Sequence, residues 1–324
     1  MYSYPVLLKR ITEAFASTPF IHDPMELYEP IAYSLDEGGK RLRPVLVLLA
    51  CDLFGGDIEK AIYPAMGLEI FHNFTLLHDD IMDQAAIRRG KESVHTKWNA
   101  NTAILSGDTM FVLAYEYVAK TDPALLPKVM DLFNDTAKKV CEGQQYDMNY
   151  ESRNGITIGD YMMMIRLKTA VLIACSLKLG AILSGAAPME AERIYEFGIH
   201  IGLAFQLQDD YLDAFGNTLK FGKAIGGDIV SNKKTFLYIK AFELATDEIL
   251  VSLTNGFTNP QLTGSKKIDL ILAIYRQLNV DKITNHEIEI HLQSALEVLE
   301  KVRVDEPRKK ELRNLTLGMM QRES

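Results

Sequence analysis

Cysteine is scarce in this chain, and its scarcity excludes two classes of small protein. The 324 residues include three cysteines, Cys51, Cys141 and Cys175, and each lies in an apolar run. Three scattered thiols are too few for a disulfide framework or for a zinc site built from cysteine. We therefore expect buried, free thiols.

Long apolar stretches and an excess of basic charge are also absent. No segment reaches the roughly 20 apolar residues that a membrane-spanning helix needs, because charged residues such as Asp52, Arg166 and Lys178 interrupt the longest runs. The N-terminal residues do not combine a basic region with an apolar stretch, so no signal peptide is indicated. The net charge of −8 argues against a nucleic-acid partner, which usually requires a basic surface. These absences predict a cytoplasmic protein without a transmembrane segment.

Alternation of polar and apolar residues with a period of two, the pattern of a half-buried strand, is nearly absent as well. Thr157 and Asp160 resemble a capping arrangement before one helix, and Pro188 is placed to begin another. Longer helical patterns cover 61–83, 99–120, 124–149 and 233–255. We therefore predict an all-α fold, a single domain over 1–324 in which roughly ten or more helices surround a central cleft.

What the chain does contain is two copies of one aspartate pattern. On a helix, positions i and i+4 lie on one face, so the outer carboxylates of each copy project together. Carboxylates that close repel one another unless a cation lies between them. Each copy follows a largely apolar helix, so we expect it to face a cleft and to bind Mg²⁺. The copies are Asp79-Asp80-x-x-Asp83 and Asp209-Asp210-x-x-Asp213.

Basic residues lie near the first copy in the sequence. Arg88 and Arg89 follow it closely, and Lys40 and Arg43 stand where Pro44 opens a helix. A helix start with cationic side chains can bind an anion, although a solvated basic turn is the simpler interpretation of Lys40 and Arg43 taken alone. Carboxylates, a metal ion and guanidinium groups together suit a diphosphate ester.

Six blocks follow one another along the chain: Gly38-Gly39-Lys40-x-x-Arg43-Pro44, the first aspartate motif with Arg88-Arg89-Gly90, Gly143-Gln144, Lys168-Thr169, Phe205-Gln206 with the second aspartate motif, and Lys223 with Asp228 and Lys233. Together they resemble the trans-isoprenyl diphosphate synthase family, the polyprenyl synthetases, and in particular its short-chain members that make geranylgeranyl or farnesyl diphosphate. The resemblance covers nearly the whole chain. It implies a Mg²⁺-dependent prenyltransferase of isoprenoid biosynthesis that condenses isopentenyl diphosphate head-to-tail with an allylic diphosphate (C5, C10 or C15) and releases diphosphate.

The resemblance also implies a role for each block. The carboxylates that hold about three Mg²⁺ ions, some arriving with the allylic diphosphate, are Asp79, Asp80, Asp83, Asp209, Asp210 and Asp213. That diphosphate is also bound by Arg88, Lys168 and Lys223. Isopentenyl diphosphate binds without metal, to Lys40, Arg43, His72 and Arg89. The residues that line the path of developing positive charge are Lys168, Thr169 and Gln206. Lys233 belongs to a lid.

Two of these residues also have simpler interpretations. A lone histidine on an apolar helix, as His72 is, is more often a packed core residue than a ligand. Lys168 could run past apolar neighbours to reach water. His78, directly before the first aspartate motif, is expected to pack.

Two phenylalanines before Asp79 predict where chain growth stops. Phe74 and Phe71 lie five and eight residues upstream, on about the same helical face. Large rings there would form the floor of a pocket. Thr75 is not a second aromatic residue, and no insertion splits the motif, a combination that resembles geranylgeranyl synthases. We predict an all-trans product of C15–C20 and favour C20.

Other functions remain open at this point. A longer-chain synthase would use the same residues, a terpene cyclase would need no isopentenyl site, and a regulatory subunit usually lacks one aspartate motif. A structural calcium-binding protein would leave the basic blocks unexplained. A homodimer is a further implication of the resemblance, with 99–120 as the expected interface.

Overall fold

The computed structural model describes residues 2–36, 39–216 and 225–320. Over these residues the chain is helical apart from one short hairpin, which confirms the predicted all-α fold. The chain groups into two compact units. Unit 1 comprises Met1–Asn134, Cys175–Tyr195 and Val302–Leu312, and unit 2 comprises Asp135–Ala174, Glu196–Lys301 and Arg313–Ser324.

Unit 1 contains the first aspartate motif and the hairpin that follows it. Its complete elements are α1 (Tyr4–Ala16), α2 (Met25–Asp36), α3 (Leu42–Leu53), α4 (Ile58–Met82), β1 (Ile87–Arg88), β2 (Lys91–Glu92), α5 (Val94–Lys97) and α6 (Ala100–Val118). It also takes in the first turns of α7 (Leu126–Ser152), α10 (Pro188–Phe215) and α17 (Glu306–Met320), and most of α9 (Val171–Leu183).

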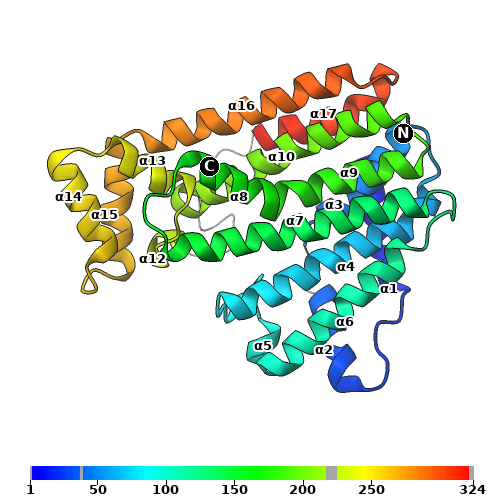
Figure 1. The fold of residues 1–324 in the computed structure, drawn as a ribbon, viewed down its shortest axis with the longest axis horizontal. Helices are drawn as coiled ribbons and strands as arrows, with labels where there is room; N and C mark the ends of the chain where they lie inside the picture. Colours follow the sequence, from blue (N-terminus) through cyan, green and yellow to red (C-terminus); the bar gives the residue numbers. More distant parts are fainter. Residues whose placement is uncertain (1, 37–38, 217–224, 321–324) are drawn as a thin grey trace. The chain divides into compact units, whose positions relative to one another are not determined.

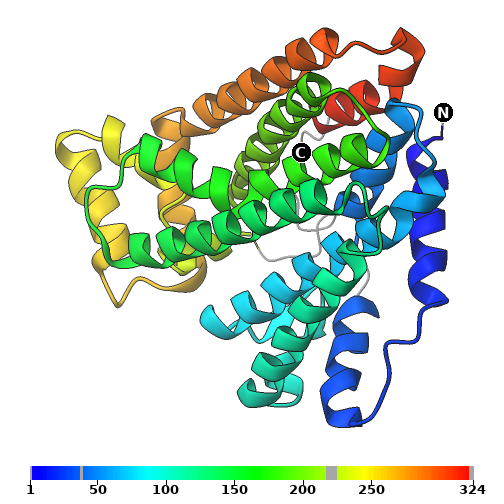
Figure 2. The same ribbon diagram turned by 45° about the vertical axis from the view of Figure 1, so that its right-hand side comes forward.

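The helix that carries the first aspartate motif, α4, is anchored along its length. Asp57 caps its start by accepting a hydrogen bond from the Glu59 N–H at 3.0 Å. Both α3 and α6 pack on it, and Figures 1 and 2 show α6 running alongside. Gly67 permits this approach, because a Cβ there would lie 2.8 Å from the Val118 nitrogen. The motif therefore stands at the end of a firmly packed helix.

Unit 2 contains the second aspartate motif. Besides the remainder of α7, α9, α10 and α17, its elements are α8 (Ile158–Ile165), η1 (Arg166–Ala170), α12 (Gly227–Val230), α13 (Phe236–Leu244), α14 (Asp247–Thr258), α15 (Gly264–Gln277) and α16 (Val280–Lys301). The capping box predicted at Thr157 and Asp160 is present at the start of α8, and α10 does begin at Pro188.

A π-helical turn, η1, interrupts the helix that carries Lys168 and Thr169. The Val171 N–H donates to the Arg166 carbonyl, five residues back, which is the bond that defines this wider turn. Two glycines admit it: a Cβ at Gly143 would lie 2.2 Å from the Lys168 nitrogen, and one at Gly202 would lie 2.4 Å from the Ala170 Cα. Backbone contact with α7 and α10 therefore holds η1 in place.

One expectation from the sequence needs correction, and another falls partly outside the described residues. The single helix expected over 233–255 is wrong, because Ala245 has extended backbone and separates α13 from α14. The loop expected over 216–232 contains the short helix α12 (Gly227–Val230), and residues 217–224 lie outside the described residues. None of the described helices is long and apolar enough to cross a membrane.

Candidate active site

In the first aspartate motif, the three carboxylates have different environments. Asp83 caps the end of α4 and is exposed, and Asp79 is half-buried. Asp80 is buried and forms an ion pair with Arg88, whose Nε and Nη2 both approach its Oδ1, at 2.7 and 2.6 Å. Burial raises the pKa of Asp80, and the Arg88 guanidinium opposes that rise. The pair thus holds Asp80 against a protein cation, whereas Asp79 and Asp83 lie nearer to solvent.

The arginines after the motif lie on a tight hairpin. Ile87 pairs with Glu92 and Arg88 with Lys91, so Arg89 and Gly90 form a two-residue loop. Both loop residues have positive φ, 51° and 80°, as a type I′ hairpin turn requires. Gly90 meets that requirement without strain, whereas Arg89 adopts a conformation unusual for a side chain of its size. Arg88 therefore belongs to a strand and Arg89 to the turn.

A group of cationic side chains forms around Arg43. Burial lowers the pKa of Arg43 to about 10, with a further contribution from Arg89, while Glu69 opposes the shift. Arg41 behaves likewise, with its pKa lowered by burial and then by Arg89. Within the described residues the buried Arg43 Nε and Arg41 Nη1 donate to no acceptor. Such buried donors are costly unless an anion completes them.

Gly39, from the first basic block, belongs to the same group. Its φ of 128° suits glycine, and a Cβ there would lie 3.0 Å from Arg89 Nη1. The absence of a side chain therefore lets the Arg89 guanidinium lie against the backbone. Lys40 is exposed, and its carbonyl accepts a hydrogen bond from the Tyr4 hydroxyl at 2.7 Å.

The two histidines of α4 have different surroundings. His72 Nε2 lies 2.9 Å from Arg43 Nη1, and because arginine can only donate, this nitrogen is an acceptor on a neutral ring. Burial lowers the pKa of His72 well below its ordinary value, and Arg43, Arg89 and Arg88 lower it further. His78 packs edge-on against Phe74 and lies 3.2 Å from the Ile104 carbonyl. The packing role predicted for His78 is confirmed.

The two phenylalanines before Asp79 belong to an aromatic cluster within unit 1. Phe74 stacks on Phe111 of α6 with ring centroids 5.1 Å apart. Phe71 is 1% exposed and contacts Phe74, Phe111 and Phe133. Phe74 is only half-buried, so it forms the outer layer of the cluster on the side of the helix that leads to the motif.

The second aspartate motif repeats the pattern of one exposed and one buried carboxylate. Asp209 is exposed, whereas Asp210 is 4% exposed and accepts hydrogen bonds from the Tyr161 hydroxyl and from Gln206 Nε2. Burial raises the pKa of Asp210, Asp228 raises it further, and Lys233 lowers it. Asp213 Oδ2 accepts from the Asp228 N–H at 2.9 Å and so holds the start of α12.

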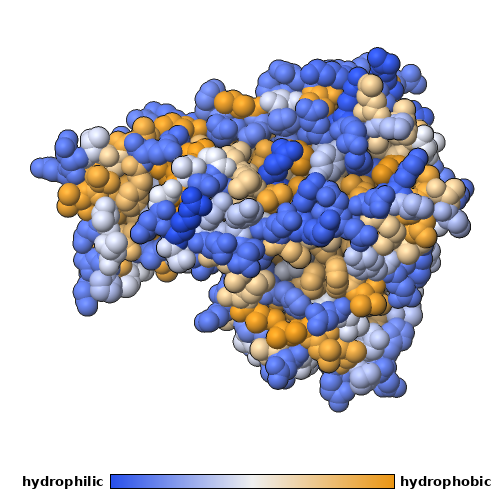
Figure 3. Space-filling model, viewed as in Figure 1, coloured by the Kyte–Doolittle hydropathy of each residue, from blue (hydrophilic) through white to orange (hydrophobic). Residues whose placement is uncertain are grey.

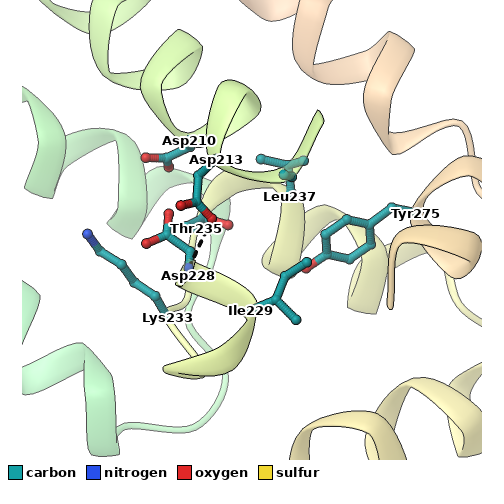
Figure 4. Close-up of a pocket in the computed structure, with 9 residues that line it drawn as sticks. Asp210, Asp213, Asp228, Ile229, Lys233, Thr235, Leu237 and Tyr275 are labelled. Atoms are coloured by element: carbon teal, nitrogen blue, oxygen red, sulfur yellow. Dashed lines mark hydrogen bonds between the residues drawn. The ribbon is translucent and has the colours of Figure 1, made fainter. Parts of the chain in front are cut away.

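Figure 4 shows the pocket beside this motif. The carboxylates of Asp210, Asp213 and Asp228 gather on one side, and Lys233 extends next to them. Lys233 is fixed through its backbone, because its N–H donates to the Asp228 carbonyl at 2.9 Å. This segment therefore supplies a cation to a pocket that is otherwise acidic.

On η1, Lys168 and Thr169 are both engaged. Lys168 Nζ lies 2.7 Å from Asp147 Oδ2, so Lys168 has a carboxylate partner and does not simply extend to water. The Thr169 hydroxyl donates to Gln206 Oε1 at 2.9 Å. Of the three residues predicted to face developing positive charge, Thr169 and Gln206 thus share a hydrogen bond, and Lys168 is held separately by Asp147.

Sequence reasoning missed four residues of these networks. A partner for Lys168 could have been anticipated, because a lysine in an apolar helix is rarely left unpaired, and Asp147 follows Gly143-Gln144 by one turn. Arg41 stands inside a block already recognised. Nothing in the sequence singles out Tyr161 or Glu69. Lys223, predicted to bind the allylic diphosphate, lies outside the described residues.

The described residues contain no group of three side chains prearranged to hold a metal ion. Mg²⁺ is nevertheless commonly held by one or two carboxylates together with substrate phosphates and water. The outward Asp79, Asp83 and Asp209 fit that manner of binding.

Comparison with known proteins shows which family the chain is similar to. Residues 24–271 match the family model for polyprenyl synthetases. The geranylgeranyl diphosphate synthase of Methanosarcina mazei is 43% identical over 222 residues, which are 68% of this chain and 68% of that protein. A crystal structure of a geranylgeranyl pyrophosphate synthase matches with a TM-score of 0.94 at 42% identity, covering 100% of both chains. The enzyme of that name from Corynebacterium glutamicum, solved with isoprenyl diphosphate and magnesium, has a TM-score of 0.87 at 25% identity and covers 99% of this chain and 98% of its own.

Proposed function

Because the chain belongs to the polyprenyl synthetase family, we propose that it condenses isopentenyl diphosphate head-to-tail with an allylic diphosphate to make a short-chain prenyl diphosphate. The family and the enzyme class predicted from the sequence, a prenyltransferase, are thereby confirmed. The Mg²⁺ requirement of the family, the number of ions and the residues that bind them are applied to this chain as part of the proposal.

The observation that carries the proposal is the cationic group around Arg43. Arg43 Nε and Arg41 Nη1 have no hydrogen-bond acceptor within the described residues. Arg89 lowers the pKa of Arg43, and the buried Glu69 opposes that shift only in part. A diphosphate would supply acceptors for these two nitrogens and further negative charge for the group. We propose that isopentenyl diphosphate binds here without metal, through Lys40, Arg43 and Arg89. In this binding mode the neutral His72 orients Arg43.

The allylic diphosphate needs a different kind of site, because breaking its C–O bond adds one negative charge to a diphosphate that is already anionic. We propose that Asp79, Asp83 and Asp209 bind about three Mg²⁺ ions together with this substrate, with Arg88, Lys168 and Lys223 as further contacts. The buried Asp80 and Asp210 and the half-buried Asp213 then act mainly by holding their surroundings in place. When bound, the metal ions neutralise the leaving diphosphate.

The remaining residues deal with positive charge. The oxygen atoms of Thr169 and Gln206, together with the backbone around Lys168, stabilise the allylic cation that forms as diphosphate leaves. The isopentenyl double bond attacks this cation, and the released diphosphate accepts the proton that is lost. Lys233 closes over the reacting groups and excludes water. We further propose that the product is C15–C20, most simply C20, because the ring of Phe74 blocks further growth.

We also propose a homodimer formed through α6. Figure 3 shows apolar side chains gathered over this region of unit 1. Three large side chains of α6 are strongly exposed: Ile104, Leu105 and Val112. Burying such a row in a symmetric contact is favourable. The cytoplasmic location remains a prediction.

The proposed function is tested by supplying the purified chain with Mg²⁺, radiolabelled isopentenyl diphosphate and each allylic primer, and then separating the products. We expect labelled prenyl diphosphates, and their loss when EDTA is added. Asp79→Asn and Asp209→Asn should each lower the rate at least tenfold and raise the Mg²⁺ concentration needed for half activity. Asp269→Asn, an exposed helical aspartate of α15, is the matched control and should change neither. If no primer incorporates label, the proposal is wrong.

A further inference from the structure

Asp210 belongs to a chain of hydrogen bonds that leads from Tyr161 to Thr169. A role as a metal ligand alone would not require such a chain. The Tyr161 hydroxyl donates to Asp210 Oδ2, and Gln206 Nε2 donates to Asp210 Oδ1 at 2.9 Å. The Thr169 hydroxyl then donates to Gln206 Oε1 at 2.9 Å. Both ends of the Asp210–Tyr161 contact are buried, with Asp210 4% and Tyr161 2% exposed.

The chemistry of the donors gives this chain one direction. The Gln206 Nε2 nitrogen faces Asp210, and an ionised Asp210 can only accept from it, so the ionised form keeps the Gln206 NH₂ group turned toward Asp210. The amide oxygen of Gln206 then faces Thr169 and receives the single hydroxyl hydrogen of that residue. The lone pairs of Thr169 are left to point elsewhere. Because Asp210 accepts a hydrogen bond from the Gln206 NH₂ group, the Gln206 oxygen accepts one from Thr169, and the Thr169 oxygen remains able to accept from a further group.

We propose that Asp210 and Tyr161 are positioning residues that fix the direction of this chain, so that Gln206 and Thr169 present oxygen atoms to the allylic cation. This inference rests on the proposed function, since it needs a cation near Thr169. If the Gln206 amide turned over, its NH₂ would face Thr169 and the dipoles near the cation would reverse. Hydrogen-bond donors pointing at a carbocation raise its free energy, whereas oxygen lone pairs lower it.

Tyr161 holds the Asp210 carboxylate in one orientation. It lies on α8, whose start is secured by the Thr157–Asp160 capping box, and its ring meets Phe236 edge-on at 6.3 Å. Burial and the negative charge of Asp210 raise the pKa of Tyr161, so its hydroxyl keeps the hydrogen that it donates. With Tyr161 on one oxygen and Gln206 on the other, Asp210 has little freedom to rotate.

The first test is Asp210→Asn, which keeps the shape but lets the side chain donate as well as accept. We expect the single-turnover rate at saturating substrates to fall about tenfold or more, as expected for reversal of one well-placed hydrogen-bond dipole. The Mg²⁺ concentration for half activity should stay within about twofold of wild type, unlike that of Asp209→Asn. If Asp210→Asn instead raises the Mg²⁺ requirement and keeps the saturated rate, Asp210 is a metal ligand and the inference is overturned.

Tyr161→Phe provides a second, independent variant. It keeps the ring and removes the hydroxyl, and we expect the single-turnover rate to fall about three- to tenfold with both KM values unchanged. Tyr150→Phe is the matched control, since Tyr150 is equally buried in unit 2 and the described residues offer its hydroxyl no hydrogen-bond partner. Thermal melting of all variants shows whether any loss reflects unfolding.

A double-mutant cycle with Thr169→Val completes the test. If Asp210 acts through Gln206 and Thr169, Asp210→Asn should slow the Thr169→Val enzyme by clearly less than it slows wild type. Full additivity would show that the two residues act separately and would overturn the inference. A wild-type chain that consumes no isopentenyl diphosphate would overturn the proposed function itself. The two failures are therefore distinct.

Discussion

At the scale of single residues, the two aspartate motifs show the same difference in burial between neighbouring aspartates. In each motif the second aspartate is buried and bonded to a protein group, Asp80 to Arg88 and Asp210 to Tyr161 and Gln206. The first aspartate of each motif lies nearer to solvent. Adjacent helical residues point in directions about 100° apart, so one can serve the interior while its neighbour serves a ligand. In each Asp-Asp pair, the first carboxylate thus lies toward solvent and the second is bonded to protein groups.

Product length depends most directly on Phe74. Phe74→Ala removes the outer ring of the cluster and leaves Phe71 and Phe111 behind it, so we expect products longer by one or more isoprene units. Chromatography of dephosphorylated products measures the change. Phe20→Ala serves as a control, because Phe20 stacks on Phe15 and Tyr117 at other positions of unit 1. Unchanged product length in Phe74→Ala would show that another residue forms the floor.

At the scale of elements, the π-helical turn is the feature on which the site most depends. Gly143→Ala would place a Cβ 2.2 Å from the Lys168 nitrogen, a distance that requires α7 or η1 to move. Overpacking of this kind costs about 1–3 kcal/mol, and a shift of Thr169 by a fraction of an ångström disturbs its geometry. We expect a lower melting temperature and a rate at least tenfold lower.

Gly159→Ala is the matched control for that change. Gly159 lies inside α8, and a Cβ there would meet only Thr157 Oγ1, at an ordinary 3.7 Å. Alanine is the better helix former by about 1 kcal/mol, so this variant should be as stable as wild type or more so. If Gly143→Ala behaves like Gly159→Ala, the backbone contact with η1 is not needed for activity.

A histidine pair links α10 to α16 and predicts how stability depends on pH. His200 Nδ1 lies 3.2 Å from His291 Nδ1, and Glu287 lies 3.6 Å from His291 Nε2. Burial lowers the pKa of His291 to about 4, and His200 lowers it further. Burial also lowers the pKa of His200, an effect that Arg166 reinforces and Glu196 opposes. Both rings are therefore neutral in the folded protein near neutral pH.

The sign of the effect follows from linkage. The unfolded chain binds a proton on His291 near pH 6.5, whereas the folded chain resists it down to about pH 4. The stability contributed by the neutral ring is therefore present above pH 6.5 and is lost as the pH falls toward 4, by about 2–3 kcal/mol. His291→Gln should flatten this part of the stability profile, measured by urea unfolding from pH 7 to pH 4. His286→Gln, on the exposed side of α16, should leave it unchanged; equal profiles for His291→Gln and wild type would contradict the account.

The sequence predicts these elements unevenly, and the reasons are local. The start of α8 follows from Thr157 and Asp160, and that of α10 from Pro188, because capping and proline chemistry act within one turn. The break at Ala245 was missed although Thr246 and Asp247 carry a helix-start signal, since the apolar pattern runs through it. The hairpin was missed because two-residue strands are too short to show alternation. The contact of Tyr161 with Asp210 depends on how α8 packs on α10, which no local pattern encodes.

At the scale of the whole molecule, the free surface of α6 predicts self-association. Val112 is 65% exposed, so Val112→Glu should leave the fold intact while placing charge in a dimer contact. We expect light scattering to give about twice the chain mass of 36.5 kDa for wild type and the single mass for the variant. Val251→Glu, at an equally exposed position on α14, is the control. A monomeric wild-type chain would rule out the dimer.

The account's central claim is that the chain joins two diphosphate substrates and does not merely ionise one. The most direct measurement is the molar ratio of diphosphate released to isopentenyl diphosphate consumed, with an allylic primer and Mg²⁺ present. Condensation predicts a ratio of about one, with no diphosphate released when isopentenyl diphosphate is omitted. Diphosphate release from the allylic substrate alone, with isopentenyl diphosphate left unconsumed, would identify a cyclase or a hydrolase and contradict the claim.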